Sequence, residues 1–276
     1  MATREEKYKT FRALHERAGA FVIPNPWDAG SAKILAALGF EALATTSAGC
    51  AFSLGYLDSA PEVTRELILA NAKSIVDATS LPVSADLQNG FGDTPEMCAE
   101  TIRLAASAGL AGGSIEDYSG DDSKPIYEFQ VAVERISAAA KAAHEANFFL
   151  TARAENYLHD RPDLDDTIRR LRAFADAGAD AVYAPGLTSI EDIRKVCAAV
   201  SKPVNVLAGM PGTRFSIEEL AEAGVKRISV GGSMARAALG ALVGAAREIK
   251  DKHTFTFAAD ALPSAEVKRY LTDTKS

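Results

Sequence analysis

Four segments of the chain repeat one pattern of hydrophobic and polar positions: an alanine- and leucine-rich helix, a glycine, and a short apolar run. They read ILAALGFEALATTS, LAASAGLAGGSIED, FADAGADAVYAPG and LAEAGVKRISVGG, with glycines at Gly39, Gly109, Gly178 and Gly224. Glycine directly after a helix adopts the left-handed conformation without a Cβ clash. Because the apolar runs do not alternate with polar residues, they are typical of parallel strands buried on both faces. The pattern predicts repeated helix–strand units.

Extending this pattern along the chain predicts eight strands. They cover residues 21–25, 41–47, 82–86, 112–116, 148–153, 181–185, 203–208 and 227–231. Eight strands alternating with helices over about 250 residues favour a (β/α)8 TIM-type barrel. A doubly wound sheet is the alternative, but no glycine-rich phosphate-binding motif follows the first strand. We expect a single domain over residues 1–276, with an N-terminal helix and a C-terminal helical tail from about residue 241.

Helix-start signals separate the predicted strands. Two pairs have the spacing of a capping box, and a third places proline in the first turn. These pairs are Thr188 with Glu191, Ser216 with Glu219, and Thr94 with Pro95. Of the histidines, His15 and His144 are expected on helix surfaces, whereas His159 follows a strand and is placed to reach the functional end of a barrel.

Composition narrows the functional class. The net charge is −7 with a pI near 5.3, and no basic run is present, which argues against a nucleic-acid-binding surface. The three cysteines have no metal-binding spacing, so we expect reduced thiols in a cytoplasmic protein. The N-terminal segment lacks the apolar core of a signal peptide, and no segment approaches the roughly 20 apolar residues of a membrane span.

Polar residues gather where the predicted strands end, which is the active-site end of a barrel. Asp86 and Glu116 follow two of these strands, and Asp58 lies in the loop after the second. Three carboxylates from neighbouring loops are suitable ligands for Mg²⁺, which takes one or two carboxylates and keeps several waters. Arg153 has the planar fork that binds a substrate carboxylate. Backbone donors at residues 45–48, with Gly49 allowing close approach, could hold another carboxylate.

Each of these residues also has a structural interpretation. Asp86 could cap the turn that precedes the following glycines, and Glu116 with Asp117 could begin a helix. Arg153 with Glu155 could form a structural ion pair. The carboxylates and the arginine together are more specific than any one of them, because they come from adjacent loops at one end of the barrel.

The segments TTSAGCAFSLGYLD, SADLQNGFGD, GGSIED and TARAEN, in this order and spacing, resemble the isocitrate lyase / phosphoenolpyruvate mutase superfamily over roughly residues 10–245. This resemblance implies a Mg²⁺-dependent barrel, with Mn²⁺ as a possible substitute, that makes or breaks C–C or C–P bonds beside a pyruvate-like enolate. It also implies a tetramer, a dimer of dimers, in which the last barrel helix is exchanged between subunits.

The same resemblance implies roles for individual residues. Ser47, Ala48 and Gly49 match a carboxylate-binding turn, and Asn205 matches a late substrate-binding asparagine. Asp58, Asp86 and Glu116 match the metal-site acids, and Arg153 matches the substrate-binding arginine. The turn Gly90–Gly92 would let the substrate approach.

Two departures from the family pattern bear on the reaction. Gln88 stands where many members have a second acid, and would lie in the outer shell of the metal. The gating loop after Asp117, which includes Tyr118 and Lys124, contains neither the Cys–His motif of the lyases nor the basic Asn-Ser pattern of the phosphomutases.

Three hypotheses follow. The first is a Mg²⁺-dependent lyase or decarboxylase that acts on a small 2-oxo or 2-hydroxy (di)carboxylate, with Arg153, Asp58 and Glu116 as the catalytic residues. The second is a C–P bond hydrolase or phosphomutase. The third is a barrel that binds an oxo-acid without turnover.

Overall fold

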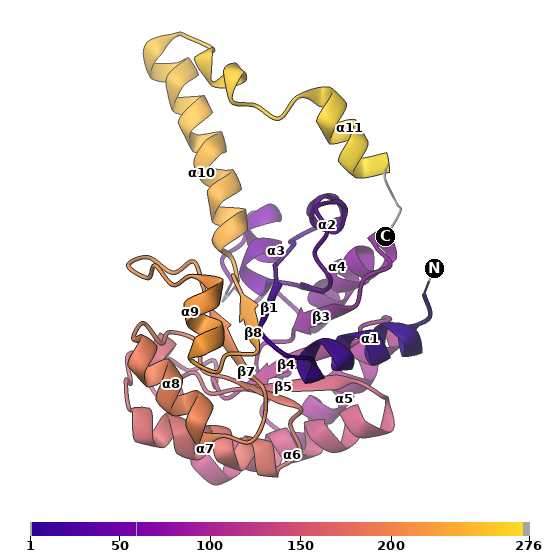
Figure 1. Cartoon of the computed structure of the whole chain (residues 1–276), viewed down its shortest axis with the longest axis vertical. Coiled ribbons are helices and arrows are strands. Elements are labelled where there is room, and N and C mark those ends of the chain that lie inside the picture. The colour runs from indigo at the N-terminus through magenta and orange to yellow at the C-terminus, as the bar shows by residue number, and fades with distance from the viewer. Residues whose placement is uncertain (1, 59, 273–276) are drawn as a thin grey trace.

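Eight parallel strands form the centre of the molecule (Figure 1). The structure is a computed structural model that describes residues 2–58 and 60–272. The strands are β1 (Phe21–Ile23), β2 (Leu43–Ala44), β3 (Val83–Asp86), β4 (Gly112–Glu116), β5 (Phe149–Arg153), β6 (Ala181–Tyr183), β7 (Val204–Leu207) and β8 (Arg227–Ser229). They hydrogen-bond in the order β1-β8-β7-β6-β5-β4-β3-β2. The predicted barrel is confirmed.

Helices surround these strands. They are α1 (Arg4–Glu16), α2 (Ala29–Ala37), α3 (Ser47–Ser53), α4 (Arg65–Ala78), α5 (Pro95–Ser107), α6 (Phe129–Glu145), α7 (Leu164–Asp176), α8 (Ile190–Ala199), α9 (Ile217–Glu222), α10 (Ser233–Arg247) and α11 (Ser264–Thr272). Short 3-10 turns lie at Asn156–His159 and Thr256–Ala259, and a π-helical turn follows α10 at Glu248–Lys252. No helix in the described ranges is long and apolar enough to cross a membrane.

The seam between β1 and β2 closes the barrel. The Ala44 amide donates to the Pro24 carbonyl across it, at 3.0 Å. The Asn25 side chain ties the seam further, because its Oδ1 accepts from the amides of Val230 and Gly231 and its Nδ2 donates to the Thr45 carbonyl. Asn25, just after β1, therefore holds together the backbone that follows β2 and β8.

The predicted helix signals are mostly confirmed. The glycines that end α2, α5, α7 and α9 all have left-handed backbone, with φ between 89° and 108°. Thr94 caps α5 with Pro95 in its first turn, and Ser216 with Glu219 forms a capping box. The pairing of Thr188 with Glu191 is wrong by one residue. Ser189 caps α8 by accepting from the Asp192 amide, since that hydroxyl directly precedes the first helical turn.

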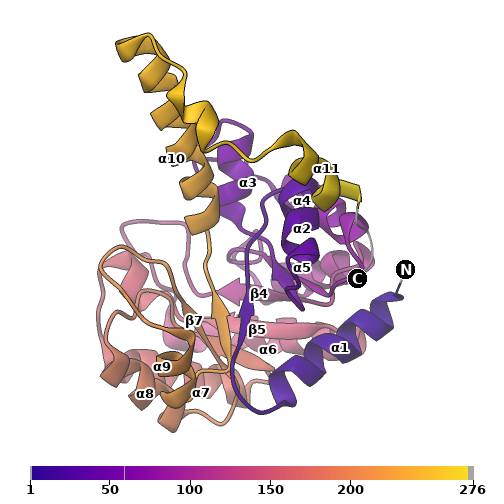
Figure 2. The same ribbon diagram turned by 45° about the horizontal axis from the view of Figure 1, so that its top comes forward.

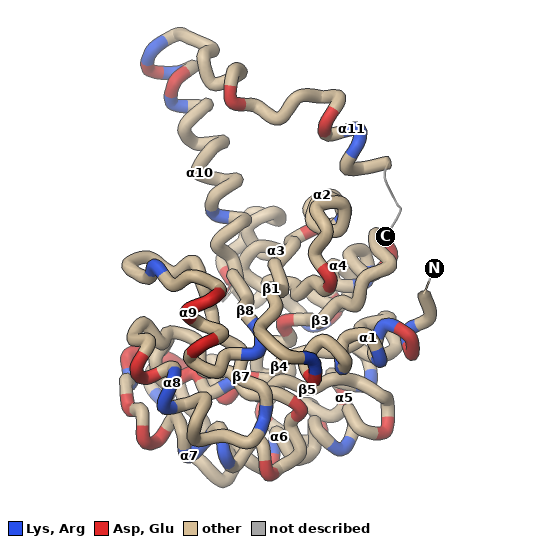
Figure 3. The backbone as a smooth tube through the Cα atoms, in the orientation of Figure 1, with Lys and Arg blue, Asp and Glu red and all other residues tan. Residues whose placement is uncertain are grey.

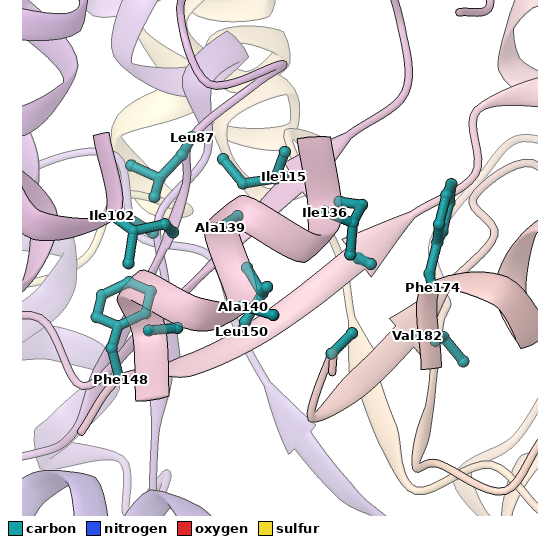
Figure 4. Packing of buried hydrophobic residues seen from close by; sticks show 14 of the residues in the cluster. Leu87, Ile102, Ile115, Ile136, Ala139, Ala140, Phe148, Leu150, Phe174 and Val182 are labelled. Carbon is teal, nitrogen blue, oxygen red and sulfur yellow. The ribbon is translucent and has the colours of Figure 1, made fainter. Parts of the chain in front are cut away.

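Apolar side chains fill the layer between the strands and the outer helices. Figure 4 shows part of it, where Ile115 of β4 and Leu150 of β5 lie near Ile136 of α6 and Phe174 of α7. A second cluster closes the end of the barrel opposite the strand termini, where α1 places Phe11 against the barrel. This arrangement tightly fixes the strands that carry the polar residues at the other end.

His15 corrects one prediction. Instead of lying on the surface of α1, its side chain is 4% exposed and stacks on Phe149 at 4.0 Å between ring centroids. It belongs to the same face of α1 as Phe11 and Leu14, which packs under the barrel. The surface expectation for His144 is confirmed.

The C-terminal region departs from the barrel. Figures 1 and 2 show α10 extending away from the strands, and α11 returning to lie beside α2. The predicted boundary near residue 241 falls inside α10, which begins at Ser233, because the alanine-rich sequence continues the helix through Gly240. Between Arg236 and Arg247 the helix carries no charged residue (Figure 3).

Candidate active site

The carboxyl ends of the strands surround two neighbouring cavities that share part of their lining. An inner cavity of about 170 Å³ extends into the barrel, and an outer one of about 710 Å³ lies under the loops. Ser47, Asp58, Asp86 and Arg153 line both, so these predicted residues meet in one place. Leu158 also lies between the cavities.

Arg153, at the end of β5, is the centre of an ion-pair network. Its Nη1 lies 3.0 Å from Asp86 Oδ1, its Nη2 lies 3.2 Å from Glu116 Oε2, and its Nε lies 2.8 Å from Glu155 Oε1. Burial opposes the charge, but these carboxylates outweigh it and hold the pKa of Arg153 well above its ordinary value. The arginine predicted to bind substrate is therefore also neutralised by protein groups.

Asp86 and Asp58 meet at one hydroxyl. Ser47 Oγ donates to Asp86 Oδ2 at 2.9 Å and lies 3.2 Å from Asp58 Oδ2, and the Ser47 amide also donates to Asp86 Oδ2. The other oxygen of Asp58, Oδ1, is buried and has no hydrogen-bond partner among the described residues. A buried carboxylate oxygen without a donor is costly and indicates a missing ligand.

Burial changes the pKa of Asp58 and of Glu116. Burial, followed by the nearby charge of Asp86, raises the pKa of Asp58 to about 6, while the Ser47 hydroxyl and the charge of Arg153 act in the opposite direction. Burial raises the pKa of Glu116 well above its ordinary value, although Arg153 opposes this shift. Carboxylates perturbed in this way, in a cavity at the active-site end of a barrel, are typical of functional sites.

The donor set fits Mg²⁺, in an arrangement narrower than the predicted one. In residues 2–58 and 60–272, no three or more His, Cys, Asp or Glu side chains are placed to hold a metal ion together. Asp58 and Asp86 face each other across Ser47, whereas Glu116 faces Arg153. Two carboxylates, one with an unpartnered oxygen, suit an ion that keeps most of its water ligands.

The segment predicted to bind a carboxylate forms the start of α3. The expected strand at 41–47 is shorter, because Thr46 caps this helix by accepting from the Gly49 amide. Ser47 and Ala48 line the inner cavity, but Gly49 does not. A Cβ on Gly49 would lie 2.9 Å from Trp27 Cβ and 3.4 Å from Ala235 Cβ. This glycine allows close helix packing, which corrects the expectation that it admits a ligand.

The turn Gly90–Gly92 needs the same correction. A Cβ on Gly90 would lie 2.9 Å from Cys98 Sγ, and one on Gly92 would collide with the Met97 side chain. Phe91 between them has a φ of 59°, which an aromatic residue adopts only under constraint. The glycines therefore fit the loop onto the start of α5, and neither lines the inner or the outer cavity.

The predicted gating loop is anchored at its base. Asp117 is buried, pairs with Arg170 at 3.1 Å and accepts from the Glu155 amide, so these contacts fix the start of the loop. Beyond it, Tyr118 stacks on His159 with ring centroids 3.9 Å apart, and both rings line the outer cavity. His159 thus lies where it was expected. Lys124 is exposed and lines neither cavity.

The inner wall contains residues that the sequence analysis missed. Arg227 of β8 is 5% exposed and donates to Asn205 Oδ1 and to Thr151 Oγ1, each at 2.9 Å. Tyr183 lies beneath Arg153, with its ring centroid 5.1 Å from the guanidinium carbon. Asn205, predicted to bind substrate, lines the inner cavity, and its amide also donates to Ser229. Alternation along β8, in which Arg227, Ser229 and Gly231 share one face, is the signal that could have revealed this layer.

The chain is similar to a known family and to several known proteins. A model of the phosphoenolpyruvate phosphomutase family matches residues 11–250. An uncharacterised protein of Mycobacterium tuberculosis (strain H37Rv) is 32% identical over 265 residues, 96% of each chain. The 2-methylisocitrate lyase of Escherichia coli K12 is 29% identical over 226 residues, which are 79% of this chain and 75% of that protein.

Two solved structures extend the similarity. A presumed lyase/mutase from Burkholderia cenocepacia J2315 is 55% identical, with a TM-score of 0.94, covering 98% of this chain and 96% of that one. A 2,3-dimethylmalate lyase of the PEP mutase/isocitrate lyase superfamily is 28% identical, with a TM-score of 0.84, covering 99% of this chain and 95% of the other.

Proposed function

Because the chain belongs to the phosphoenolpyruvate phosphomutase family, within the isocitrate lyase / phosphoenolpyruvate mutase superfamily, we propose that it is a Mg²⁺-dependent lyase or decarboxylase. Its substrate is a small 2-oxo or 2-hydroxy (di)carboxylate that reacts through a pyruvate-like enolate. The observation that carries this proposal is the pair Asp58 and Asp86 beside Arg153, with Asp58 Oδ1 unpartnered among the described residues.

Each residue has a role in this proposal. Asp86 and Asp58 hold Mg²⁺ directly or through water, with Glu116 and Gln88 in its outer shell. When bound, Mg²⁺ supplies Lewis-acid stabilisation of the negative charge that develops on a substrate oxygen. Arg153, already oriented by Glu116 and Glu155, has N–H groups left to donate to the same oxygen. Ser47 and Ala48 at the start of α3 position the substrate from the opposite wall.

Exclusion of water completes the site. The enolate must be kept from stray protonation, and the stacked rings of Tyr118 and His159 line the outer cavity through which water would reach it. Lys124 does not reach either cavity, so a phosphonate would find no second cation in the loop. This placement favours C–C over C–P chemistry.

Turnover with and without metal tests the proposal. Pyruvate formation would be measured for oxaloacetate, methyl-substituted malates, isocitrate, methylisocitrate and phosphonopyruvate, with Mg²⁺ and with EDTA. We expect EDTA-sensitive turnover of one carboxylate substrate, and a loss of at least 100-fold in Asp86→Ala with the melting temperature kept. Asp77→Ala, which removes an exposed carboxylate on α4, is the matched control. Turnover by Asp86→Ala at the wild-type rate would refute the metal assignment.

We further propose that the protein is a tetramer, a dimer of dimers, in which α10 is exchanged between subunits. Leu239, Leu242 and Val243 of α10 are 40–64% exposed in the single chain, and an apolar helix face of this kind needs a partner. Leu242→Glu is expected to reduce the mass measured by sedimentation velocity, because it buries a charge in that contact. Val131→Glu on α6 is the control. An unchanged mass in Leu242→Glu would argue against the exchange.

A further inference from the structure

The side chain of Arg227 crosses the interior of the barrel and forms the inner end of the cavity. From β8 it donates through Nε to Asn205 of β7 and through Nη2 to Thr151 of β5. Its Nη1 lies 3.4 Å from His15 Nε2, beneath the barrel. A guanidinium has five N–H groups, so these three contacts leave two without an acceptor among the described residues.

His15 contributes no charge to this group. Its Nδ1 lies 2.8 Å from the Phe11 carbonyl, which can only accept, so Nδ1 carries the proton. The lone pair is then on Nε2 and accepts from Arg227. Burial, followed by the charge of Arg227, lowers the pKa of His15 to about 3, which keeps the ring neutral at physiological pH.

No carboxylate balances the charge of Arg227 in residues 2–58 and 60–272. The ion pairs of that part of the chain do not include it, and its hydrogen-bond acceptors are an amide, a hydroxyl and a neutral imidazole. Burial lowers its pKa to about 10, so it stays protonated at neutral pH. A buried, unpaired cation is strongly unfavourable unless an anion accompanies it.

Charged side chains therefore lie at both ends of the cavity. Asp58 and Asp86 lie at its mouth together with Arg153, whose charge several carboxylates already neutralise. Arg227 lies at its inner end, beside the hydroxyls of Thr151 and Ser229. An anion that enters past the mouth meets one uncompensated positive charge and several hydrogen-bond donors.

We propose that Arg227 forms an anion subsite at the inner end of the barrel cavity, and that the substrate is a dicarboxylate with one carboxylate at this subsite and its reacting end beside Arg153. This deepens the proposed function and rests on it for the carboxylate class. The cavity of about 170 Å³ limits the dicarboxylate to a few carbon atoms. The subsite distinguishes dicarboxylates from monocarboxylates, because only the former can satisfy Arg227 and the mouth together.

Equilibrium binding tests the subsite without turnover. Isothermal titration calorimetry would compare malonate and succinate with propionate and butyrate, at saturating Mg²⁺ and in EDTA. For the wild type we expect at least tenfold tighter binding of the dicarboxylates. In Arg227→Met that preference should disappear, whereas Arg227→Lys, which keeps the charge, should retain part of it. Arg172→Met removes an exposed positive charge outside the cavities and should bind as the wild type does.

Several results would overturn the subsite. Unchanged dicarboxylate affinity in folded Arg227→Met would do so, as would equal losses in the Met and Lys variants, which would indicate packing alone. If Arg227→Met does not fold, the binding data for the wild type decide. A preference of the wild type for dicarboxylates over monocarboxylates below twofold then refutes the proposal. Dicarboxylate preference without turnover of any substrate would refute the proposed function and keep the subsite. EDTA-sensitive turnover with no effect of Arg227→Met on binding would support the proposed function and refute the subsite.

Discussion

Two arginines inside the same barrel are treated in opposite ways. Arg153 at the rim is surrounded by Asp86, Glu116 and Glu155, all within 3.2 Å of its guanidinium nitrogens. Arg227, deeper in the barrel, has only neutral acceptors among the described residues. Both are largely buried, so both have lost the hydration that makes an exposed charge inexpensive.

The charge of Arg153 is used within the protein, whereas the charge of Arg227 is available to a ligand. The carboxylates around Arg153 compensate its charge, and Arg153 in turn fixes the carboxylates that flank the proposed metal site. Arg227 carries potential that the protein leaves uncompensated, which is how a binding site attracts an anion. Stability and ligand binding should therefore respond differently to loss of each arginine.

Loss of Arg153 should have the largest effect on stability. Arg153→Met leaves buried carboxylates near one another without a cation, and removal of one partner from such a network costs about 3–5 kcal/mol. Urea denaturation at pH 7 should measure this decrease in the free energy of unfolding. The deficit should shrink toward pH 5, because the variant's carboxylates can then take up protons.

Arg169→Met is the matched control for that experiment. Arg169 pairs with Asp166 on the surface of α7, where both groups are solvated, so its loss should cost less than about 1 kcal/mol. Similar losses in the two variants would mean that the Arg153 network does not depend on burial.

The buried His15 should make the free energy of unfolding depend on pH. Its folded-state pKa of about 3 lies below the ordinary value of 6.5, so between these values the unfolded chain binds more protons. The contribution of neutral His15 to the free energy of unfolding is complete above pH 6.5 and is lost as the pH falls toward 3. From pH 7 to pH 5 the expected loss is about 2 kcal/mol.

The variant His15→Gln isolates this contribution. An amide can donate to the Phe11 carbonyl and accept from Arg227 without titrating, so the loss between pH 7 and pH 5 should be smaller than in the wild type by that amount. Parallel pH profiles for the two proteins would show that His15 is protonated in the folded state.

The barrel itself could be predicted from the sequence because its signals are local. Gly39 and Gly224 end helices through their own backbone conformation, and buried parallel strands need continuous apolar runs. The errors were local as well. The strand predicted at 41–47 runs past the end of β2 into α3. Threonine is common in strands, but Thr46 caps a helix here.

The site was less predictable because partners meet only in three dimensions. The rim positions of Asp86 and Arg153 follow from strand ends, yet their ion pair spans 67 residues of sequence. Sequence alone assigned Arg153 to the substrate, and the one signal for Arg227 was its alternation with Ser229 and Gly231 in a short apolar strand. His15 was misplaced because a histidine on a charged helix reads as exposed until the helix is docked beneath the barrel.

The smallest expected effect on the free energy of unfolding is that of Arg227→Met, and it distinguishes the two arginines most clearly. Arg227→Met removes a buried cation and supplies an unbranched apolar side chain that can occupy part of the same space. The gain from removing an unpaired charge offsets the donors lost to Asn205 and Thr151, whose oxygens can accept from water in the adjoining cavity. The free energy of unfolding should therefore stay within about 1 kcal/mol of the wild type. A loss as large as that of Arg153→Met would show that Arg227 is part of a stabilising network, because only then would its removal leave buried groups unsatisfied.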